Sequence, residues 1–331
     1  MALKDYSTTP ANNNSAPPNG APEGMAPSAV NDVIRQVMAD VRTEYNLTIP
    51  ALIPGGRLTL TTGVPVTTAD VSGAEAIYYA PYIHDKIVLF DGTNWRQYTF
   101  TERTIDVPDA TNMYDVFIYD NAGSITLELT AWTNETTRAT ALTMQDGVLV
   151  KTGALTRRYL GSFYCTTAGN GQTEDSKAKR YLWNYYNRVR REMRNATETT
   201  DSWNYTTAAF RQANTNTANQ LDFAIGVSES IVSAQVHSSV SNNLAGGTVT
   251  PAVGIGVDST TVSGSASTML NTCTVANCLV PQSAEYRGLP GVGRHFLAWL
   301  EYSPATGVTT WYGDSGVPDR LQSGIFGEVW A

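Results

Sequence analysis

Aromatic side chains beside polar ones are the feature of this sequence that points most directly to chemistry. Sugar rings stack on the exposed faces of Trp and Tyr, while Asn, Asp and Arg side chains bond their hydroxyl groups. In the C-terminal part of the chain the candidates are Trp203, Tyr205, Tyr286, Trp299, Trp311, Tyr312 and Trp330. Most of them are expected to pack in a core or between subunits. Trp311 and Tyr312 precede a glycine turn, so we predict that these two are exposed and contact a glycan.

The segment Gly313-Asp-Ser-Gly316 copies the residues around the nucleophile of chymotrypsin-like serine proteases, and His84 lies upstream. The match ends there, because Val317 stands where a further glycine is expected and His84 is not in an Ala-Ala-His-Cys context. A type I or II turn accounts for the same four residues. We therefore predict no catalytic residue in this segment.

Other patterns that suggest catalysis or metal binding are equally incomplete. A polysaccharide hydrolase needs two carboxylates at a defined separation, and no family-specific context surrounds the candidates Glu285, Glu301, Asp314 and Asp319. No Cys or acidic side chain lies at ligand spacing from the histidines, His84, His237 and His295. Residues 254–258 predict a strand of small residues rather than a phosphate loop. For Asp115, Asp120 and Asn121, turn capping is favoured over a calcium site. We expect no metal and no cofactor.

The first predicted elements of the chain are an N-terminal arm and one short helix. Residues 6–24 are rich in Pro, Asn, Gly and Ala, so this arm gains order only from a partner surface. A helix is predicted over residues 27–46, with Ser28 as its N-cap. Its apolar stripe is too short to stand alone, and about three copies packed side by side would bury it. The predicted oligomer seam is Val30, Val33, Ile34, Val37 and Val41.

The run from Gly20 to Arg42, with Glu-Gly-Met-Ala-Pro-Ser-Ala-Val-Asn at its centre, resembles the N-terminal virion-attachment segment of tailed-bacteriophage fibre and appendage proteins. Residues 114–123, 157–161, 172–176 and 183–190 are also similar to phage structural proteins, so the likeness covers residues 1 to about 225. The resemblance implies that the arm anchors the chain to another virion protein. The residues expected to anchor it are Pro10, Pro17, Pro18, Pro22, Met25 and Pro27.

Composition limits the class of protein. The 331 residues predict two globular units besides the arm, and abundant Thr, Asn, Ser and Gly favour antiparallel sheets with tight turns. The formal net charge of −8 argues against nucleic-acid binding. No segment of the sequence predicts a signal peptide or a membrane helix. For Cys165, Cys273 and Cys278 we favour buried free thiols, as expected in a reducing cytoplasm, although Cys273 and Cys278 could pair.

Turn signals and alternating hydrophobicity divide the chain into five parts. Residues 1–46 form the attachment arm and helix, and residues 47–56 a Pro/Gly hinge. Residues 57–166 form a first β domain, residues 167–200 a loop and connecting helix, and residues 201–331 a second β domain like a jelly roll. Asp91-Gly92 and Asn121-Ala-Gly123 predict hairpin turns.

The connecting helix is predicted over residues 174–194, where Ala178, Leu182, Tyr185 and Val189 fall at helical spacing. This segment holds seven basic side chains against three acidic ones. Because the rest of the chain is acidic, we expect the basic groups to meet acidic partners within the protein or in a neighbouring subunit.

These expectations combine into one interpretation. The fold is mainly β, with an N-terminal arm and helix and two antiparallel sandwich domains joined by a helix. The chain is expected to be a non-enzymatic structural component of a tailed-bacteriophage virion, assembled in the host cytoplasm. A homotrimeric tail fibre or adaptor is favoured, attached to other virion proteins through its arm and presenting its C-terminal part to a host-surface glycan or a further fibre protein. The alternatives are a head-decoration protein and a tail-borne polysaccharide hydrolase.

Overall fold

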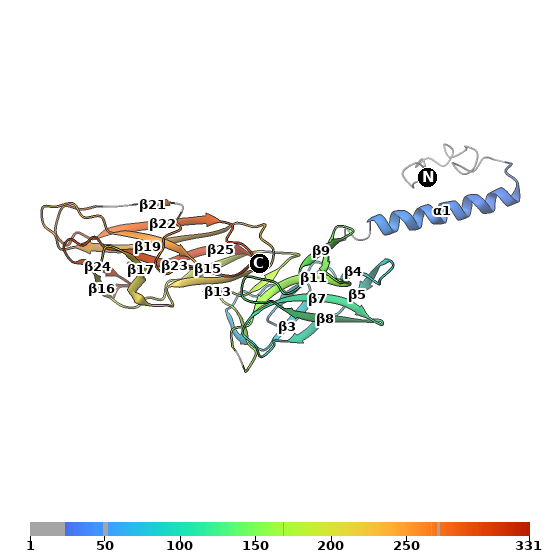
Figure 1. Ribbon diagram of the computed structural model, residues 1–331, viewed down its shortest axis with the longest axis horizontal. Helices are drawn as coiled ribbons and strands as arrows, with labels where there is room; N and C mark the ends of the chain where they lie inside the picture. The colour runs from blue at the N-terminus through green and yellow to red at the C-terminus, as the bar shows by residue number, and fades with distance from the viewer. Residues whose placement is uncertain (1–23, 49–51, 168, 266, 270–271) are drawn as a thin grey trace.

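The computed structural model describes residues 24–48, 52–167, 169–265, 267–269 and 272–331, and the backbone alone of residues 43–48 and 267. The molecule is elongated, with the helix α1 (Pro27–Thr48) at one end and β-rich units along the rest (Figure 1). Strands make up 49% of the chain, in several antiparallel sheets that include a curled half-barrel. The predicted mainly β fold is confirmed.

The helix α1 is present where the sequence predicts it, but its start differs. The helix begins at Pro27, and proline is well suited to the first helical position because its fixed φ matches the helix and its missing N–H would be unpaired there. Ser28 therefore lies inside the first turn, and its predicted role as N-cap is wrong.

The first β unit consists of three sheets. Strands β1 (Gly56–Thr59), β3 (Ala76–Pro81) and β6 (Arg103–Asp106) form one, and β4 (Lys86–Phe90) pairs with β5 (Trp95–Thr99) in a second. The third has the order β8 (Ser124–Ala131), β7 (Met113–Asn121), β11 (Ala154–Tyr164), β10 (Val148–Lys151) and β9 (Leu142–Gln145). Their core includes Ile77, Leu89 and Phe163, all fully buried.

Both predicted hairpin turns are confirmed. Between β4 and β5, the carboxylate of Asp91 accepts hydrogen bonds from the backbone N–H groups of Thr93 and Asn94. Between β7 and β8, Ala122 and Gly123 both have positive φ, at 50° and 94°, as a type I′ hairpin requires. The carboxylate of Asp120 accepts a hydrogen bond from the N–H of Gly123, so its predicted turn-capping role is also confirmed. The same prediction is wrong for Asp115, which is buried within β7 and pairs with Arg138.

The second β unit is a sandwich of two sheets. One has the order β17 (Phe210–Gln212), β23 (Gly293–Tyr302), β18 (Gln220–Ile225), β13 (Lys179–Arg180), β12 (Thr173–Asp175) and β2 (Val71–Ala74), and β20 (Ala252–Val257) also pairs with β23. The other has the order β15 (Arg190–Asn195), β25 (Gly324–Trp330), β19 (Val232–Asn242), β22 (Val280–Gly288) and β21 (Ser267–Met269). In the same sheet β24 (Thr309–Tyr312) also pairs with β19, and β16 (Ser202–Tyr205) pairs with β24. Trp299 and Trp311 come from opposite sheets and share one core.

The two units are joined by more than the chain between them. Strand β2 belongs to the first half of the sequence, yet it completes a sheet of the second unit by pairing with β12. Phe117 and Tyr159 of the first unit pack in the same core as Trp299 and Trp311. Arg138 donates a hydrogen bond of 2.6 Å to the backbone oxygen of Gly226. These links fix the orientation of one unit on the other.

The predicted connecting helix over residues 174–194 is wrong. The segment forms the strands β12, β13, β14 (Leu182–Asn184) and β15. Residues 181–184 are all buried in succession, which suits a strand packed on both faces and not a helix with one buried stripe. In β15, exposed and buried residues alternate, which is the period of a strand. Pairing with β11, β18 and β25 overrides the helical spacing of the apolar residues.

Six of the seven basic side chains of this segment meet acidic partners within the protein, as predicted, and Arg194 is the exception among the described ion pairs. Arg180 and Arg191 both contact the carboxylate of Asp175, each at 2.9 Å. The remaining pairs are Lys177–Glu192, Lys179–Glu174, Arg188–Glu229 and Arg190–Glu328. Most of the positive charge of the segment is therefore balanced by carboxylates of the same chain.

The prediction of three free thiols holds for one cysteine and fails for the other two. Cys165 is a buried free thiol, as predicted. Cys273 and Cys278, however, form a disulfide, so the preference for free thiols there is wrong. The turn between them, in which Asn277 has φ of 60°, brings their Cα atoms to 6.1 Å, within the usual range for a disulfide. Among the described residues, no helix has the length and apolar character needed to cross a membrane.

Candidate functional site

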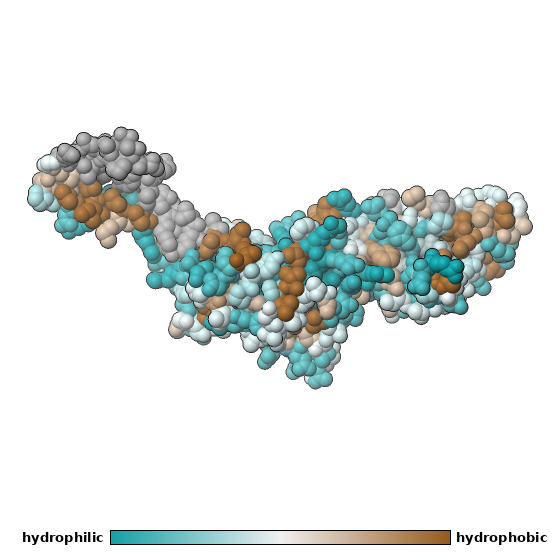
Figure 2. Space-filling view, turned by 180° about the vertical axis from the view of Figure 1, so that it is seen from behind, coloured by the Kyte–Doolittle hydropathy of each residue, from teal (hydrophilic) through white to brown (hydrophobic). Residues whose placement is uncertain are grey.

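The helix α1 presents an exposed apolar stripe. Val30, Ile34, Val37 and Val41 have exposed fractions of 41%, 51%, 37% and 49%, and their spacing of four, three and four residues places them on one side of the helix. Val33, the fifth predicted seam residue, is half-buried. Figure 2 shows hydrophobic side chains gathered along α1, at the left of that view. Whether other chains cover this stripe stays a prediction.

The predicted anchoring residues lie mostly outside the described part of the chain. Pro10, Pro17, Pro18 and Pro22 belong to residues 1–23, which the structure does not describe. Met25 is half-buried and Pro27 is exposed at the first position of α1.

Trp311 is fully buried, so the prediction that it contacts a glycan is wrong. Its strand β24 is paired on both sides, with β16 and with β19, and its side chain packs in the sandwich core. The indole N–H donates a hydrogen bond of 3.2 Å to the hydroxyl of Ser303. Tyr312 is half-buried, and its hydroxyl lies 3.2 Å from that of Ser241. In the second unit, Trp330 instead offers a ring that a ligand can reach, because it is 45% exposed at the end of β25.

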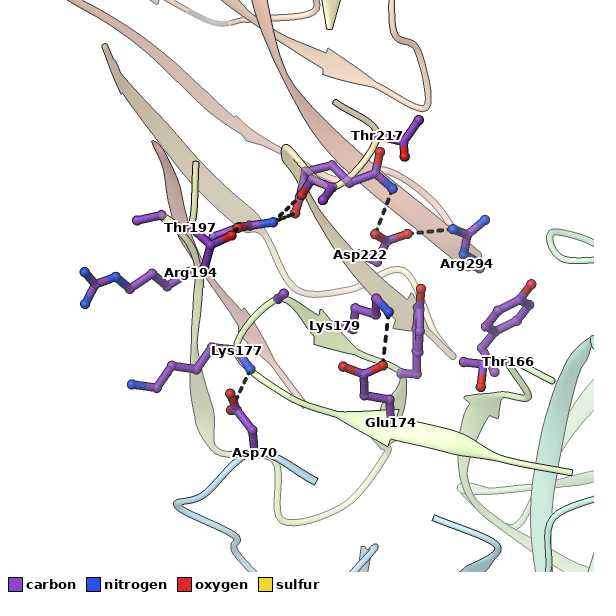
Figure 3. A pocket seen from close by; sticks show the side chains of 17 residues that line it. Asp70, Thr166, Glu174, Lys177, Lys179, Arg194, Thr197, Thr217, Asp222 and Arg294 are labelled. Carbon is purple, nitrogen blue, oxygen red and sulfur yellow. Dashed lines mark hydrogen bonds and ion pairs between the residues drawn. The ribbon is translucent and has the colours of Figure 1, made fainter. Parts of the chain in front are cut away.

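A polar cleft of about 870 Å³ lies between the two β units (Figure 3). Its walls come from the residue before β2, the end of β11, the turn from β12 to β13, the segments after β15 and before β18, and β23. The side chains that Figure 3 labels are Asp70, Thr166, Glu174, Lys177, Lys179, Arg194, Thr197, Thr217, Asp222 and Arg294. The lining is mostly polar and holds charges of both signs.

The carboxylates of this cleft are already occupied. Asp222 accepts hydrogen bonds from Arg294 at 2.6 Å and from the side-chain amide of Gln220 at 2.8 Å. Glu174 pairs with Lys179 at 3.1 Å, and Asp70 accepts from a backbone N–H at 2.8 Å. The first two carboxylates are held within the second unit, and the bond of Asp70 to Lys177 ties the segment before β2 to the turn from β12 to β13. Arg194 makes no ion pair within the described residues, so a ligand here would meet mainly hydroxyl groups and this cation.

Two buried tyrosines form the inner wall of the cleft. Burial raises the pKa of Tyr164 to about 12, and burial raises the pKa of Tyr181 above its usual range. Both phenols therefore stay protonated at neutral pH. Because both rings are buried, they offer no face on which a sugar could stack.

The carboxylates considered for glycan hydrolysis lie in different parts of the structure and differ in burial. Glu301 is fully buried, and burial raises its pKa, against the opposing effect of Trp203 and Arg211. Its two oxygens accept hydrogen bonds of 2.7 Å from these residues, so they are engaged in the core. Glu285 is exposed on β22, and Asp314 accepts from the N–H of Gly316 in a turn, as the turn reading of residues 313–316 predicts.

One histidine has an acidic partner that the sequence did not suggest. The Nδ1 atom of His295 lies 2.8 Å from the carboxylate of Asp258, which follows β20 in the chain and sits beside β23 in space. Among the described residues, no group of three or more His, Cys, Asp and Glu side chains is placed to hold a metal ion.

No protein-family model and no curated protein matches this chain. Solved structures give distant matches. A structure described as "EclA C-terminal domain; sugar-binding protein" is 13% identical, covers 38% of this chain and 75% of its own, and has a TM-score of 0.19. A Bacillus thuringiensis Cry1Da tryptic core variant is 7% identical, with a TM-score of 0.19, over 87% of this chain and 54% of its own. The structure of the infectious bursal disease virus Gx strain is 10% identical, with a TM-score of 0.17, and the match covers 84% of this chain and 74% of its own. Scores this low carry no argument about function.

Proposed function

We propose that this chain is a structural component of a tailed-bacteriophage virion. It would be an oligomeric tail fibre or adaptor that is anchored by residues 1–46 and presents its β units for attachment to the host surface or to another fibre protein. The observation that carries the proposal is the exposed apolar stripe on α1, a helix that lies apart from the β units in Figure 1. The sequence resemblance of residues 20–42 to virion-attachment segments supports the same role.

The spacing of the stripe supports a trimer. Val30, Ile34, Val37 and Val41 are separated by four, three and four residues, so they occupy alternating d and a positions of a coiled coil. All four side chains are β-branched. β-branched residues at both a and d positions favour three or more strands over two. The stripe spans fewer than two heptads, so the helices need support from the rest of the chain or from a virion partner.

The mass of the full-length chain in solution tests this proposal. Light scattering should give a trimer for the full-length chain, and a weakened or dissociated assembly for a chain that lacks residues 1–46. The double variant Ile34→Asn and Val37→Asn should dissociate in the same way, because it places polar groups in the seam. The matched control is Asn31→Ala, which changes an exposed polar residue of the same helix.

A full-length chain that is monomeric at every concentration would contradict the helix seam. It would favour a decoration protein that assembles only on the particle. Unchanged mass in the double variant would place the interface between copies elsewhere in the chain.

A further inference from the structure

Two adjoining hollows form one groove on the outer face of the second β unit. Their volumes are about 480 Å³ and 300 Å³, and both are lined by Ser233, Glu285 and Glu328. Ligand pockets in proteins have volumes of this order. The strands beneath them, β25, β19 and β22, lie side by side in one sheet (Figure 1).

The strand register explains the shape of the groove. Ser233 of β19 is paired with Glu328 of β25 on one side and with Arg287 of β22 on the other. Neighbouring strands lie about 4.8 Å apart, so the flanking side chains stand about 10 Å apart. The short side chain of Ser233 between them forms the floor. Trp330 lies two residues after Glu328, and so on the same face of the sheet, where it forms one wall.

Trp330 offers the features of a stacking platform. Its side chain is 45% exposed, and Ile231, at the same end of the groove, is also exposed. Within the described residues, no aromatic ring or cation packs on the indole, and no hydrogen bond engages its N–H. An indole with a free face and a free N–H donor can stack on the C–H face of a sugar ring and bond one of its hydroxyls.

The polar groups of the groove have unused hydrogen-bonding capacity. Glu285 and Arg287 are both exposed and make no ion pair with any residue that the structure describes. A carboxylate and a guanidinium provide acceptors and donors respectively, which together suit the vicinal hydroxyls of a sugar.

The charges of the groove balance. Its lining includes the three carboxylates of Glu229, Glu285 and Glu328 and the guanidinium of Arg287. Arg188 and Arg190 pair with Glu229 and Glu328 from outside the groove, so three negative charges meet three positive ones. Such a site offers no net electrostatic attraction to a strongly anionic ligand. An acyl chain would contact an apolar surface on one side only.

We propose that this groove binds a neutral saccharide, with Trp330 stacking on a sugar ring while Glu285 and Arg287 bond its hydroxyls. This inference rests on the proposed role in host attachment only for the source of the sugar, a bacterial surface polysaccharide. The site itself lies within one chain, so sugar binding does not need the α1 seam.

The test uses oligosaccharides as probes. Neutral and acidic oligosaccharides released from bacterial surface polysaccharides are screened by biolayer interferometry against the immobilised full-length chain. The tightest neutral probe is then titrated against Trp330→Ala, Trp330→Phe and Glu285→Gln. The matched control is Tyr82→Ala, because Tyr82 is an aromatic residue of the first unit with an exposed fraction of 42%. Glu285→Gln retains the side-chain shape, so it tests the site even if the tryptophan variants are unstable.

We expect Trp330→Ala to weaken binding by at least about tenfold, as truncation of an aromatic anchor does. Trp330→Phe should lose less, Glu285→Gln should weaken binding, and Tyr82→Ala should bind as the unaltered chain does. The inference is overturned if no neutral probe binds, if acidic probes bind more tightly, or if Trp330→Ala binds unchanged.

Light scattering on the same samples separates this inference from the proposed function. A trimer that binds no neutral sugar overturns the groove alone. A monomer that binds sugar through Trp330 supports the groove and contradicts the seam.

Discussion

Arg57, in the first strand of the β units, donates a hydrogen bond of 2.6 Å from its Nη2 atom to the backbone oxygen of Ala331, directly after the last strand. Its Nη1 atom donates to the backbone oxygen of Asn187 at 2.7 Å. The side chain is buried, and burial lowers the pKa of Arg57 to about 10, so it remains charged at neutral pH. One guanidinium therefore ties β1, the segment before β15 and the end of β25 together.

Replacement of Arg57 by Met should destabilise the fold. Both backbone oxygens would lose a charged donor, and such hydrogen bonds contribute about 1.5–3 kcal/mol each. We expect the free energy of unfolding in urea to fall by roughly 2 kcal/mol or more, since methionine keeps part of the packing. Arg35→Met, on the exposed surface of α1, is the control and should change stability little. Equal stability of the two variants would show that the link is dispensable.

Glu198 should make stability depend on acid pH. Burial would raise the pKa of this carboxyl, but hydrogen bonds from Thr200, Asn216 and Asn219 outweigh burial and lower the pKa from 4.5 to about 2. A carboxyl whose pKa is lower in the folded state stabilises the fold above its unfolded pKa, and this contribution is lost as pH falls from about 4.5 towards 2.

Glu198→Gln should therefore reduce the loss of stability between about pH 5 and pH 2 by an amount on the order of 2–3 kcal/mol. Urea unfolding at several pH values in this range measures the effect. Glu75→Gln, at an exposed position, is the control. A Glu198→Gln profile parallel to that of the unaltered chain would contradict the prediction.

Asp115 and Arg138 should couple the two β units. Arg138 donates to both oxygens of Asp115, at 2.7 and 3.1 Å, and also to the backbone oxygen of Gly226 in the second unit. Asp115→Ala would leave the largely buried guanidinium without its counter-charge, which costs about 3–5 kcal/mol. Differential scanning calorimetry should show a lower melting temperature, whereas exposed Asp85→Ala should leave it almost unchanged. Similar melting temperatures for the two variants would contradict this role.

The thiols should label in a fixed order. Native protein without reductant should take up no iodoacetamide, because Cys165 is buried and Cys273 and Cys278 are paired. Denaturation should expose one thiol, and denaturation with reductant all three, as counted by intact mass. Three labels after denaturation without reductant would contradict the disulfide. That result would show that Cys273 and Cys278 stay free in protein purified from a reducing cytoplasm.

Much of the strand pattern follows from local sequence. The hairpins β4–β5 and β7–β8 are predictable because turn residues such as Asp91 and Gly123 separate runs rich in β-branched and aromatic side chains. Strands such as β13 are not predictable in this way. Its two residues, Lys179 and Arg180, pair in parallel with β18, and only the tertiary fold supplies that partner.

The exposure of single aromatic residues is the least predictable feature. Trp311 and Trp330 both lie near glycines and polar residues, yet one is buried and the other exposed. The difference lies in which face of its strand each residue occupies and in what covers that face. One local signal was available for Trp330, because Glu328, two residues earlier, must lie on the same face of the strand. A carboxylate there argues for solvent.

The pairing of β2 with β12 also constrains the order in which the chain can fold during synthesis. The strand that holds Ala74 is complete long before the ribosome reaches its partner Thr173. Until then the edge of β2 is unpaired, and an unpaired edge is open to the wrong partner. In a cell that makes many copies at once, the nearest wrong partner is the same strand of another copy of the chain. Assembly therefore depends on how fast residues 75–172 are translated, as well as on the stability of the finished molecule.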